Sequence, residues 1–369
     1  MMLRRHWLQI IKSRVAVFDG PLLAIVCAIA VLSLFTMYSS AYNFPGRFEG
    51  HVRNLFIAFA LMWLLANVSP QTMMRLAVPV YTIGVTLLIA VVLFGVVKKG
   101  ARRWLDVGAL NIQPSEILKI GLPLMLAWYF HKREAVLGWR DFALGAVILA
   151  VPTALILKQP DLGTATLVFA AGASVIFFAG LSWKVLVAIV TAGLASLPLI
   201  WTLMHDYQRE RVMTLLDPTS DPLGKGFHII QSTIAIGSGG VLGKGWMQGT
   251  QTHLEFIPER TTDFIFSVYS EEFGLVGNLV LCALYLALLS RAFVIAGNAP
   301  SLFTRLMAGA ITMILFMYAF VNMGMVSGIL PVVGVPLPLM SYGGTAMVTL
   351  GIGLGMLMSI QRHRKLVQT

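Results

Sequence analysis

The residue with the clearest chemical potential is a single carboxylate, Asp263, in the stretch HLEFIPERTTDFIFSVYSEEFGLVG (253–277). It lies where a long polar segment, about 205–262, meets an apolar run that continues to about residue 289. Polar groups at membrane depth are costly, so a carboxylate at this boundary indicates a function. The alternative is structural, because Thr-Thr-Asp is also usual chemistry for the start of a helix.

Asp263 is predicted to act alone, as a single general base. On a straight helix, Glu271 lies roughly 12 Å further along and Glu272 points to the opposite face. That separation excludes a two-metal site that includes Asp263, because the ions of such a site lie ~4 Å apart. It also excludes a glycosidase-type pair of carboxylates, which lie up to ~9.5 Å apart. The loop histidines lack the i, i+3 or i, i+4 spacing of metal ligands, namely His205, His228 and His253.

A second polar group lies in GARRWLDVGALNIQPSEILKIG (100–121). Pro114 suits the first position of a helix, and Glu116 then falls in the first turn, where the helix dipole favours a carboxylate. Lys119 lies three residues further on the same face, so a Glu116–Lys119 pair is expected. The pair either allows two charges to lie near the membrane or contacts a substrate directly, and both interpretations stay open.

A third group is Lys158-Gln-Pro-Asp161-Leu-Gly-Thr, which joins two apolar runs with almost no loop. Asp161 is best interpreted as the cap of the helix that follows, and it is also placed to contact an anion or a sugar. The segment 98–103 contains four cations, Lys98, Lys99, Arg102 and Arg103, which are suited to anionic lipid head groups or a pyrophosphate, the alternative being a solvated loop. The long polar segment is cationic too, through Arg209, Arg211, Lys225, Lys244 and Arg260.

The elements that must position these residues are membrane helices. Of the 369 residues, 57% are hydrophobic and only 12% are charged, and the mean hydropathy is +0.82. A soluble domain carries about 25% charged residues, and apolar runs of about 20 residues match the thickness of a bilayer. Only helices are realistic spanning elements here, which predicts an all-α polytopic membrane protein. Ten spans are expected, at about 21–40, 54–69, 77–97, 115–131, 141–157, 162–180, 184–204, 264–289, 304–330 and 344–360.

Ten spans place both termini on one side, and Lys and Arg residues in short loops are more numerous on that side than on the other. The termini are therefore predicted to be cytoplasmic, with residues 1–20 as the N-terminal segment and 361–369 as the tail. The long loop 205–262, between the seventh and eighth spans, then faces outward. The cations are spread over many loops, which argues against nucleic-acid binding. The whole chain, 1–369, is expected to form one integral-membrane domain.

Several motifs in order resemble the SEDS family (shape, elongation, division and sporulation), and the elongation member more closely than the division paralogue. They are GARRWLDVGALNIQPSEILK, QPDLGT, YQRERV followed by LLDP, IAIGSGGVLGKGW, IPERTTDFIFSVYSEEFG and LPLMSYGG. The resemblance implies a ten-helix peptidoglycan glycosyltransferase that polymerises lipid II at the outer face of the cytoplasmic (inner) membrane. It also implies a class B penicillin-binding protein as partner, together with other proteins of the elongation complex.

The resemblance places the essential acidic residue of the family at Asp263 and further site residues at Glu116, Lys119 and Asp161. The basic residues Arg102, Arg103, Arg209, Arg211, Lys244 and Arg260 are our candidates for binding substrate, some of them through the departing diphosphate. A divalent cation such as Mg or Mn would be compatible with this chemistry, although the sequence contains no dedicated set of ligands. A lipid II flippase and a non-catalytic scaffold are the competing hypotheses, since a helical membrane fold does not determine function.

Overall fold

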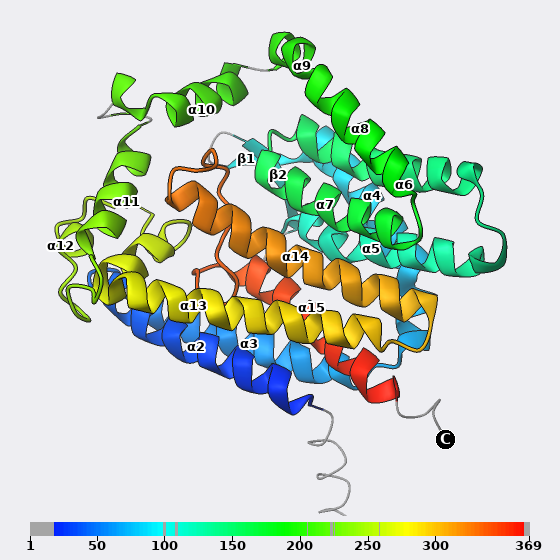
Figure 1. Ribbon diagram of the computed structural model, residues 1–369, viewed down its shortest axis with the longest axis horizontal. Helices are drawn as coiled ribbons and strands as arrows, with labels where there is room; N and C mark the ends of the chain where they lie inside the picture. Colours follow the sequence, from blue (N-terminus) through cyan, green and yellow to red (C-terminus); the bar gives the residue numbers. More distant parts are fainter. Residues whose placement is uncertain are drawn as a thin grey trace, which may run out of the picture.

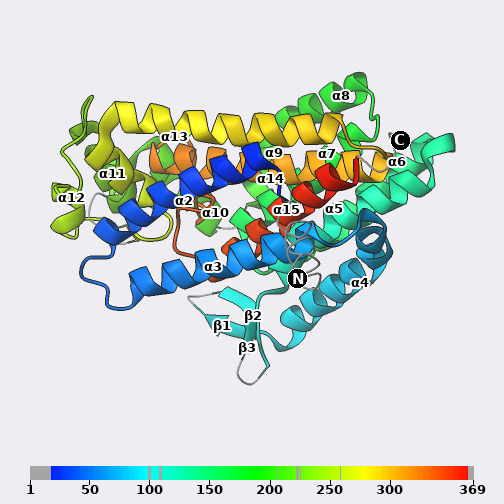
Figure 2. The same cartoon turned by 90° about the horizontal axis from the view of Figure 1, so that it is seen from below.

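Long apolar helices make up most of the chain in the computed structural model, which describes residues 18–98, 101–107, 110–204, 206–221, 224, 226–257 and 259–364. Figures 1 and 2 show these helices running side by side along the long axis of the molecule. The helices are α2 (Gly20–Ser40), α3 (Arg47–Ala66), α4 (Pro70–Phe94), α5 (Pro114–Lys132), α6 (Trp139–Lys158), α7 (Leu162–Phe178), α8 (Trp183–Ala195), α9 (Leu197–Leu203), α10 (Asp206–Leu216), α11 (Phe227–Ser238), α12 (Thr250–His253), α13 (Ile265–Gly297), α14 (Leu302–Val326) and α15 (Gly344–His363).

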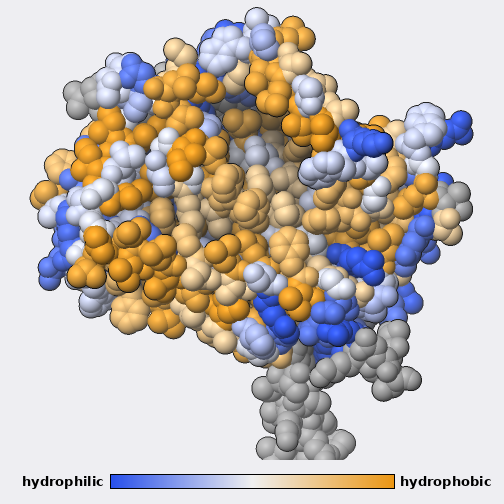
Figure 3. Space-filling view, in the orientation of Figure 1, coloured by the Kyte–Doolittle hydropathy of each residue, from blue (hydrophilic) through white to orange (hydrophobic). Residues whose placement is uncertain are grey.

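Seven of the described helices are long and apolar enough to cross a membrane, namely α2, α3, α4, α6, α13, α14 and α15. The apolar helices α7 and α8 are shorter, and α5 has 19 residues that include Glu116 and Lys119. The chain is therefore a multi-pass membrane protein, while the count of ten spans stays a prediction. Figure 3 shows hydrophobic side chains over most of one face and hydrophilic ones mainly at its margins.

Several predicted spans differ from the structure in their bounds, among them 77–97, which is α4 (Pro70–Phe94), and 264–289, which is α13 (Ile265–Gly297). The span expected at 54–69 corresponds to α3, which begins earlier, at Arg47, and ends at Ala66. The span expected at 184–204 is two helices, α8 and α9, which meet at Ser196. Pro198 explains the break, because proline has no N–H for the preceding turn and is favoured in the first turn of a new helix.

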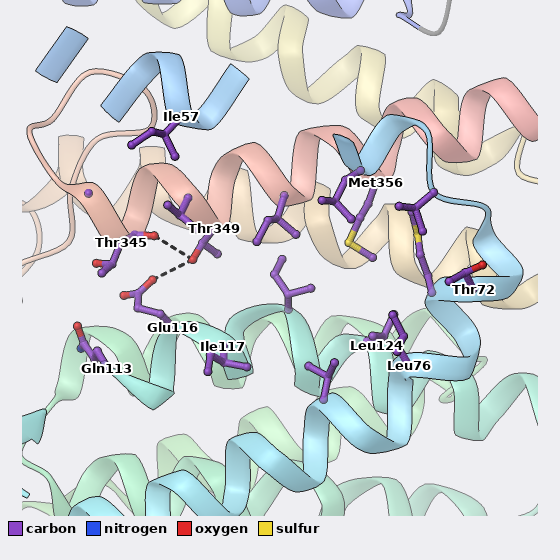
Figure 4. Close-up of a pocket in the computed structure, with 18 of the residues that line it drawn as sticks. Ile57, Thr72, Leu76, Gln113, Glu116, Ile117, Leu124, Thr345, Thr349 and Met356 are labelled. Carbon is purple, nitrogen blue, oxygen red and sulfur yellow. Dashed lines mark hydrogen bonds between the residues drawn. The ribbon is translucent and has the colours of Figure 1, made fainter. Parts of the chain in front are cut away.

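The centre of the molecule is formed by α14 and α15. In each of them 72% of an apolar stretch of 18 residues is buried, against 22% to 39% of the corresponding stretch in the other five long helices. Helix α15 packs closely along α3, because a Cβ atom at Gly351 would lie 2.5 Å from Ala58 O and one at Gly355 would lie 2.5 Å from Met62 O. Small residues four apart allow membrane helices to approach in this way. The approach places the start of α15 beside the start of α5 (Figure 4).

Three short antiparallel strands follow α4, which the apolar pattern of the sequence did not predict. Strand β1 (Val96–Lys98) pairs with β2 (Ala101–Val107), and β2 pairs with β3 (Leu110–Ile112). They lie at the end of α4 and lead directly into α5 (Figure 2). The pairing matters for the site because it brings Arg103, on β2, towards the start of α7.

Helix α13 reverses direction at Gly274, so the straight helix expected from the sequence is wrong. Gly274 has φ 63° and ψ −160°, a backbone conformation open essentially to glycine alone. Tyr269 Oη donates to Gly277 O at 2.8 Å, and Ser270 Oγ donates to Asn278 Oδ1 at 2.9 Å. Residues eight apart are separated by about 12 Å on a straight helix, too far for these contacts. The helix therefore consists of a short arm, 265–273, and a long arm, 275–297.

A loop from the long polar segment, 239–252, closes over this reversal, and we call it the strap. Lys244 N donates to Glu271 O and Leu275 N donates to Gly240 O, with distances of 3.0 and 2.9 Å. The Glu271 carboxylate is fully buried and accepts hydrogen bonds from Lys244 Nζ at 2.7 Å and from Gln251 N at 2.8 Å. Glu271 therefore contacts residues of the long loop, and does not extend deeper into the membrane as the straight helix predicted.

Candidate active site

A polar cavity of about 300 Å³ lies where α5, α7, α13 and α15 begin. Four carboxylates, one lysine and one arginine line it, together with backbone from the loop between α14 and α15. The structure therefore gathers the three polar groups of the sequence analysis into one place. The lining residues are Arg103, Gln113, Glu116, Lys119, Asp161, Thr164, Leu167, Glu259, Thr262, Asp263, Gly334, Val335, Pro336, Tyr342, Gly343, Thr345 and Ala346.

The expected Glu116–Lys119 pair is confirmed. Helix α5 begins with Pro114, and Lys119 Nζ lies 2.7 Å from Glu116 Oε1 one turn later. Lys119 also donates to Tyr318 Oη at 2.6 Å, and Thr349 Oγ1 donates to the second oxygen of Glu116 at 3.0 Å. The lysine side chain is buried, so its charge depends on these partners. Helices α5, α14 and α15 are thus joined through one ion pair.

The predicted cap at Asp161 is confirmed too, and the same carboxylate faces the cavity. Asp161 Oδ1 accepts from Thr164 N at 3.1 Å at the start of α7. Its other oxygen accepts from Gln113 Nε2 at 3.3 Å and lies 3.8 Å from Arg103 Nε. Arg103 also donates to the carbonyls of Gln159 and Pro160. About a third of the Arg103 side chain stays exposed, so it is accessible to an anion in the cavity.

Asp263 lies in the turn before α13 and does not cap that helix. The N-cap is Phe264, with no capping side chain, so the structural alternative for Asp263 is not what the structure shows. The Asp263 side chain is half-buried on the cavity wall. A Cβ atom built at Gly334, which has φ 73°, would lie 3.3 Å from Asp263 Oδ2, so the opposite loop approaches the carboxylate closely. A carboxylate beside a cavity of this size is placed to accept a proton from a bound hydroxyl.

An apolar cavity of about 730 Å³ adjoins the polar one, and Gln113, Glu116 and Thr345 line both. It runs between α3, α4, α5 and α15, and aliphatic side chains such as Ile117, Val348 and Met356 form most of its wall. Figure 4 shows Glu116 and Thr349 joined by a hydrogen bond at the end near the polar cavity. A ligand with a long apolar chain and a polar head would fit across the two cavities.

Arg209, Lys244 and Arg211 do not line the polar cavity. Arg209, on α10, donates to the carbonyls of Trp201 and Thr202 at 2.9 and 2.7 Å. Lys244 contacts Glu271 in the strap, as described above. The Arg211 side chain, also on α10, is not among those lining the polar cavity. The Arg102 and Lys225 side chains fall outside the described residues.

Arg260 is a buried structural cation, although it lies only three residues from Asp263. Its side chain is 2% exposed, and it donates from Nε to Ser40 O at 2.9 Å. Its guanidinium also lies over the rings of Tyr42 and Phe44. Burial lowers the pKa of this guanidinium from its usual value. These contacts attach the turn before Asp263 to the loop after α2.

Three residues of the site were not predicted from the sequence. Tyr318 is the second partner of Lys119, Asn322 contacts the backbone of Asp263, and Glu259 lines the polar cavity. A polar residue within an apolar run was the available signal for Tyr318 and Asn322. Among the residues that the structure describes, no group of three or more His, Cys, Asp or Glu side chains is placed to hold a metal ion.

Comparison with known proteins agrees with this geometry. The FtsW/RodA/SpoVE family model, described as "cell cycle protein", matches residues 15–366. The peptidoglycan glycosyltransferase MrdB of Escherichia coli K12 is 49% identical over 350 residues, which cover 95% of each chain. A chain from a peptidoglycan synthase complex, whose structure concerns the coordination of polymerization and crosslinking, has a TM-score of 0.81 and 37% identity over 94% of this chain and 98% of its own.

The crystal structure of the rod shape determining protein RodA of Thermus thermophilus is similar as well. Its TM-score is 0.71 at 32% identity, over 94% of this chain and 97% of its own. These matches extend over nearly the whole chain, including α5, the turn before α13 and the loop before α15. The prediction made from the sequence motifs is confirmed: the chain belongs to the FtsW/RodA/SpoVE family of cell cycle proteins.

Proposed function

We propose that this protein is a peptidoglycan glycosyltransferase that polymerises lipid II into β-1,4 glycan strands during cell elongation. The observation that carries the proposal is the pair of adjoining cavities, one polar with Asp263 on its wall and one apolar. Lipid II is an amphipathic substrate, with a sugar diphosphate head and a polyprenyl tail. The identity of 49% to MrdB over 95% of both chains supports elongation in preference to the division paralogue.

In the proposed reaction, Asp263 accepts the proton of the GlcNAc 4-hydroxyl while the oxygen of that hydroxyl attacks the anomeric carbon of the donor MurNAc. A C–O bond forms on one face as the bond to the diphosphate breaks on the other. The electron pair leaves with the diphosphate, and inversion produces the β-1,4 link. No protonating acid is required, because the diphosphate is already a good leaving group.

Arg103 is the cation best placed to stabilise the leaving diphosphate. It faces the polar cavity and is partly exposed, whereas Arg209, Lys244 and Arg260 contact protein groups outside it. A fixed cation at the site of developing negative charge lowers the barrier, because it needs no reorganisation during the reaction. The Glu116–Lys119 pair lies at the junction of the cavities, where the diphosphate joins the tail.

The proposed topology has ten spans, with both termini cytoplasmic and the loop 205–262 outside. It places the polar cavity at the outer face of the inner membrane, where lipid II is displayed. The whole chain, 1–369, then forms one membrane domain. A class B penicillin-binding protein is the proposed partner, and the similarity to a chain of a peptidoglycan synthase complex supports it.

Polymerisation of labelled lipid II by the full chain with this partner tests the proposal. We expect long glycan strands from the wild type and none from Asp263→Asn, because an amide cannot accept the proton. Asp217→Asn is the matched control, since Asp217 caps a 3-10 helix, η2 (Pro218–Ser220), away from the cavities and Asn is also a good cap.

Polymer from the folded Asp263→Asn protein at the wild-type rate would remove Asp263 from the mechanism. No polymer from the wild type, combined with lipid II transport in vesicles, would favour the flippase hypothesis. No polymer and no transport would favour a scaffold.

A further inference from the structure

Asn322, near the end of α14, joins two backbone segments that form walls of the polar cavity. Its side chain is fully buried, and Nδ2 donates to Asp263 O at 2.8 Å and to Val335 O at 2.7 Å. A primary amide has two N–H groups, so one carbonyl takes each of them. This single planar group therefore holds the carbonyl of Asp263 against the loop on the opposite wall.

The remaining atom of this side chain indicates that stability is not its main role. Asn322 Oδ1 is buried and has no hydrogen-bond partner among the described residues. A buried acceptor without a partner costs about 1–3 kcal/mol. The opposite orientation of the amide would direct Oδ1 at two carbonyl oxygens, which repel it. The atom that faces both carbonyls is therefore Nδ2.

Asp263 lies before the first residue of α13, so its backbone is positioned by the hydrogen bonds of the turn and by the contact with Asn322. Helix α13 begins only at Ile265, and the preceding residues form a turn. Across the cavity, Gly334 lies close enough to Asp263 Oδ2 that an added Cβ atom would be in tight contact. A shift of either backbone segment therefore changes where the carboxylate points and how much room a hydroxyl has beside it.

We propose that Asn322 is a positioning residue for glycosyl transfer, which sets the place of the Asp263 carboxylate relative to the loop 331–337. The inference rests on the proposed function, in which Asp263 is the general base. Misplacement of a reacting group by about 1 Å can reduce a rate on the order of 100-fold. Loss of the two contacts is thus expected to reduce kcat while the affinity for lipid II, which depends on both cavities, changes little.

The test measures initial rates of lipid II polymerisation by the full chain with its class B partner, over a range of lipid II concentrations. Asn322→Asp keeps the shape and leaves at most one donor for two carbonyls, and Asn322→Leu removes both donors at similar volume. The control is Thr312→Val, another fully buried position on α14, whose hydroxyl donates only to Ala308 O of its own helix. Thermal unfolding in detergent reports whether each variant is folded.

The expected result is a decrease in kcat of about 10-fold to 100-fold for both Asn322 variants, with KM within about twofold and the control unchanged. A folded Asn322 variant with wild-type kcat would overturn the inference and leave the proposed function intact. Loss of the folded state in both Asn322 variants would also overturn it, because Asn322 would then be structural. A wild type that makes no polymer would overturn the proposed function, and the inference with it.

Discussion

Replacement of Gly274 by alanine is expected to open the reversal in α13. The residue has φ 63° and ψ −160°, and such a conformation costs a residue with a side chain about 1–3 kcal/mol. An added Cβ atom would lie 2.3 Å from Gly243 N and 2.8 Å from Val241 O. Both are backbone atoms of the strap, so the strap itself must move.

That movement breaks hydrogen bonds that join the strap to the reversal. Four backbone bonds cross it, two from the strap to the short arm and two from the long arm to the strap, with distances of 2.9 to 3.1 Å. Losing two of them costs about 1–3 kcal/mol, which brings the total effect of Gly274→Ala to about 2–6 kcal/mol. The short arm begins two residues after Asp263, so activity is expected to fall together with stability.

The assay is thermal unfolding of the full-length protein in detergent, with Gly237→Ala as the matched control. Gly237 lies within α11, and a Cβ atom there would meet nothing within 4 Å. Alanine in a helix interior is favourable relative to glycine by about 0.5–1 kcal/mol, so the control should melt at the wild-type temperature or slightly higher. We expect Gly274→Ala to melt about 3–8 °C lower. A Gly274→Ala protein with unchanged melting temperature and unchanged polymerisation would refute the account of the reversal.

Three further predictions concern the two cavities. Lys119→Met leaves the Glu116 carboxylate without its cation and is expected to lower the free energy of unfolding by about 3–5 kcal/mol. The double variant with Glu116→Gln should lose less than the sum of the two single changes, which a double-mutant cycle in thermal unfolding will show. Arg103→Gln is expected to reduce kcat about 100-fold, and Arg209→Gln less than twofold, in the same polymerisation assay; equal effects would contradict the assignment of the leaving-group cation. Val348→Trp partly fills the apolar cavity, so KM should increase for lipid II with a full-length tail and much less for a short-chain analogue; equal increases would show that the tail lies elsewhere.

Local chemistry in the sequence determined the parts of the site that depend on neighbours along the chain. The Glu116–Lys119 pair follows from a spacing of three residues on a helix that Pro114 begins, and the cap at Asp161 follows from its place before an apolar run. The membrane class followed from composition and from the length of the apolar runs. Each of these features involves only a few consecutive residues or an average over the chain.

Packing between distant segments decided which of the candidate cations face the cavity. Arg103 reaches Asp161 because β2 pairs with its neighbours and lies beside the start of α7. Arg260 lies in the same motif as Asp263, yet its guanidinium donates to Ser40 O at the end of α2. A charge pattern does not predict these choices, because each depends on a contact across more than 50 residues of sequence.

The sequence by itself thus determined a multi-pass membrane protein of a recognisable family, with Asp263, Glu116, Lys119 and Asp161 as its candidate polar residues. Only the tertiary structure decided that α13 reverses at Gly274, that Asn322 holds the backbone of Asp263, and that a polar and an apolar cavity share one wall. The physical reason is that helix starts and i, i+3 pairs are local, whereas a cavity exists only where several helices fail to fill the space between them.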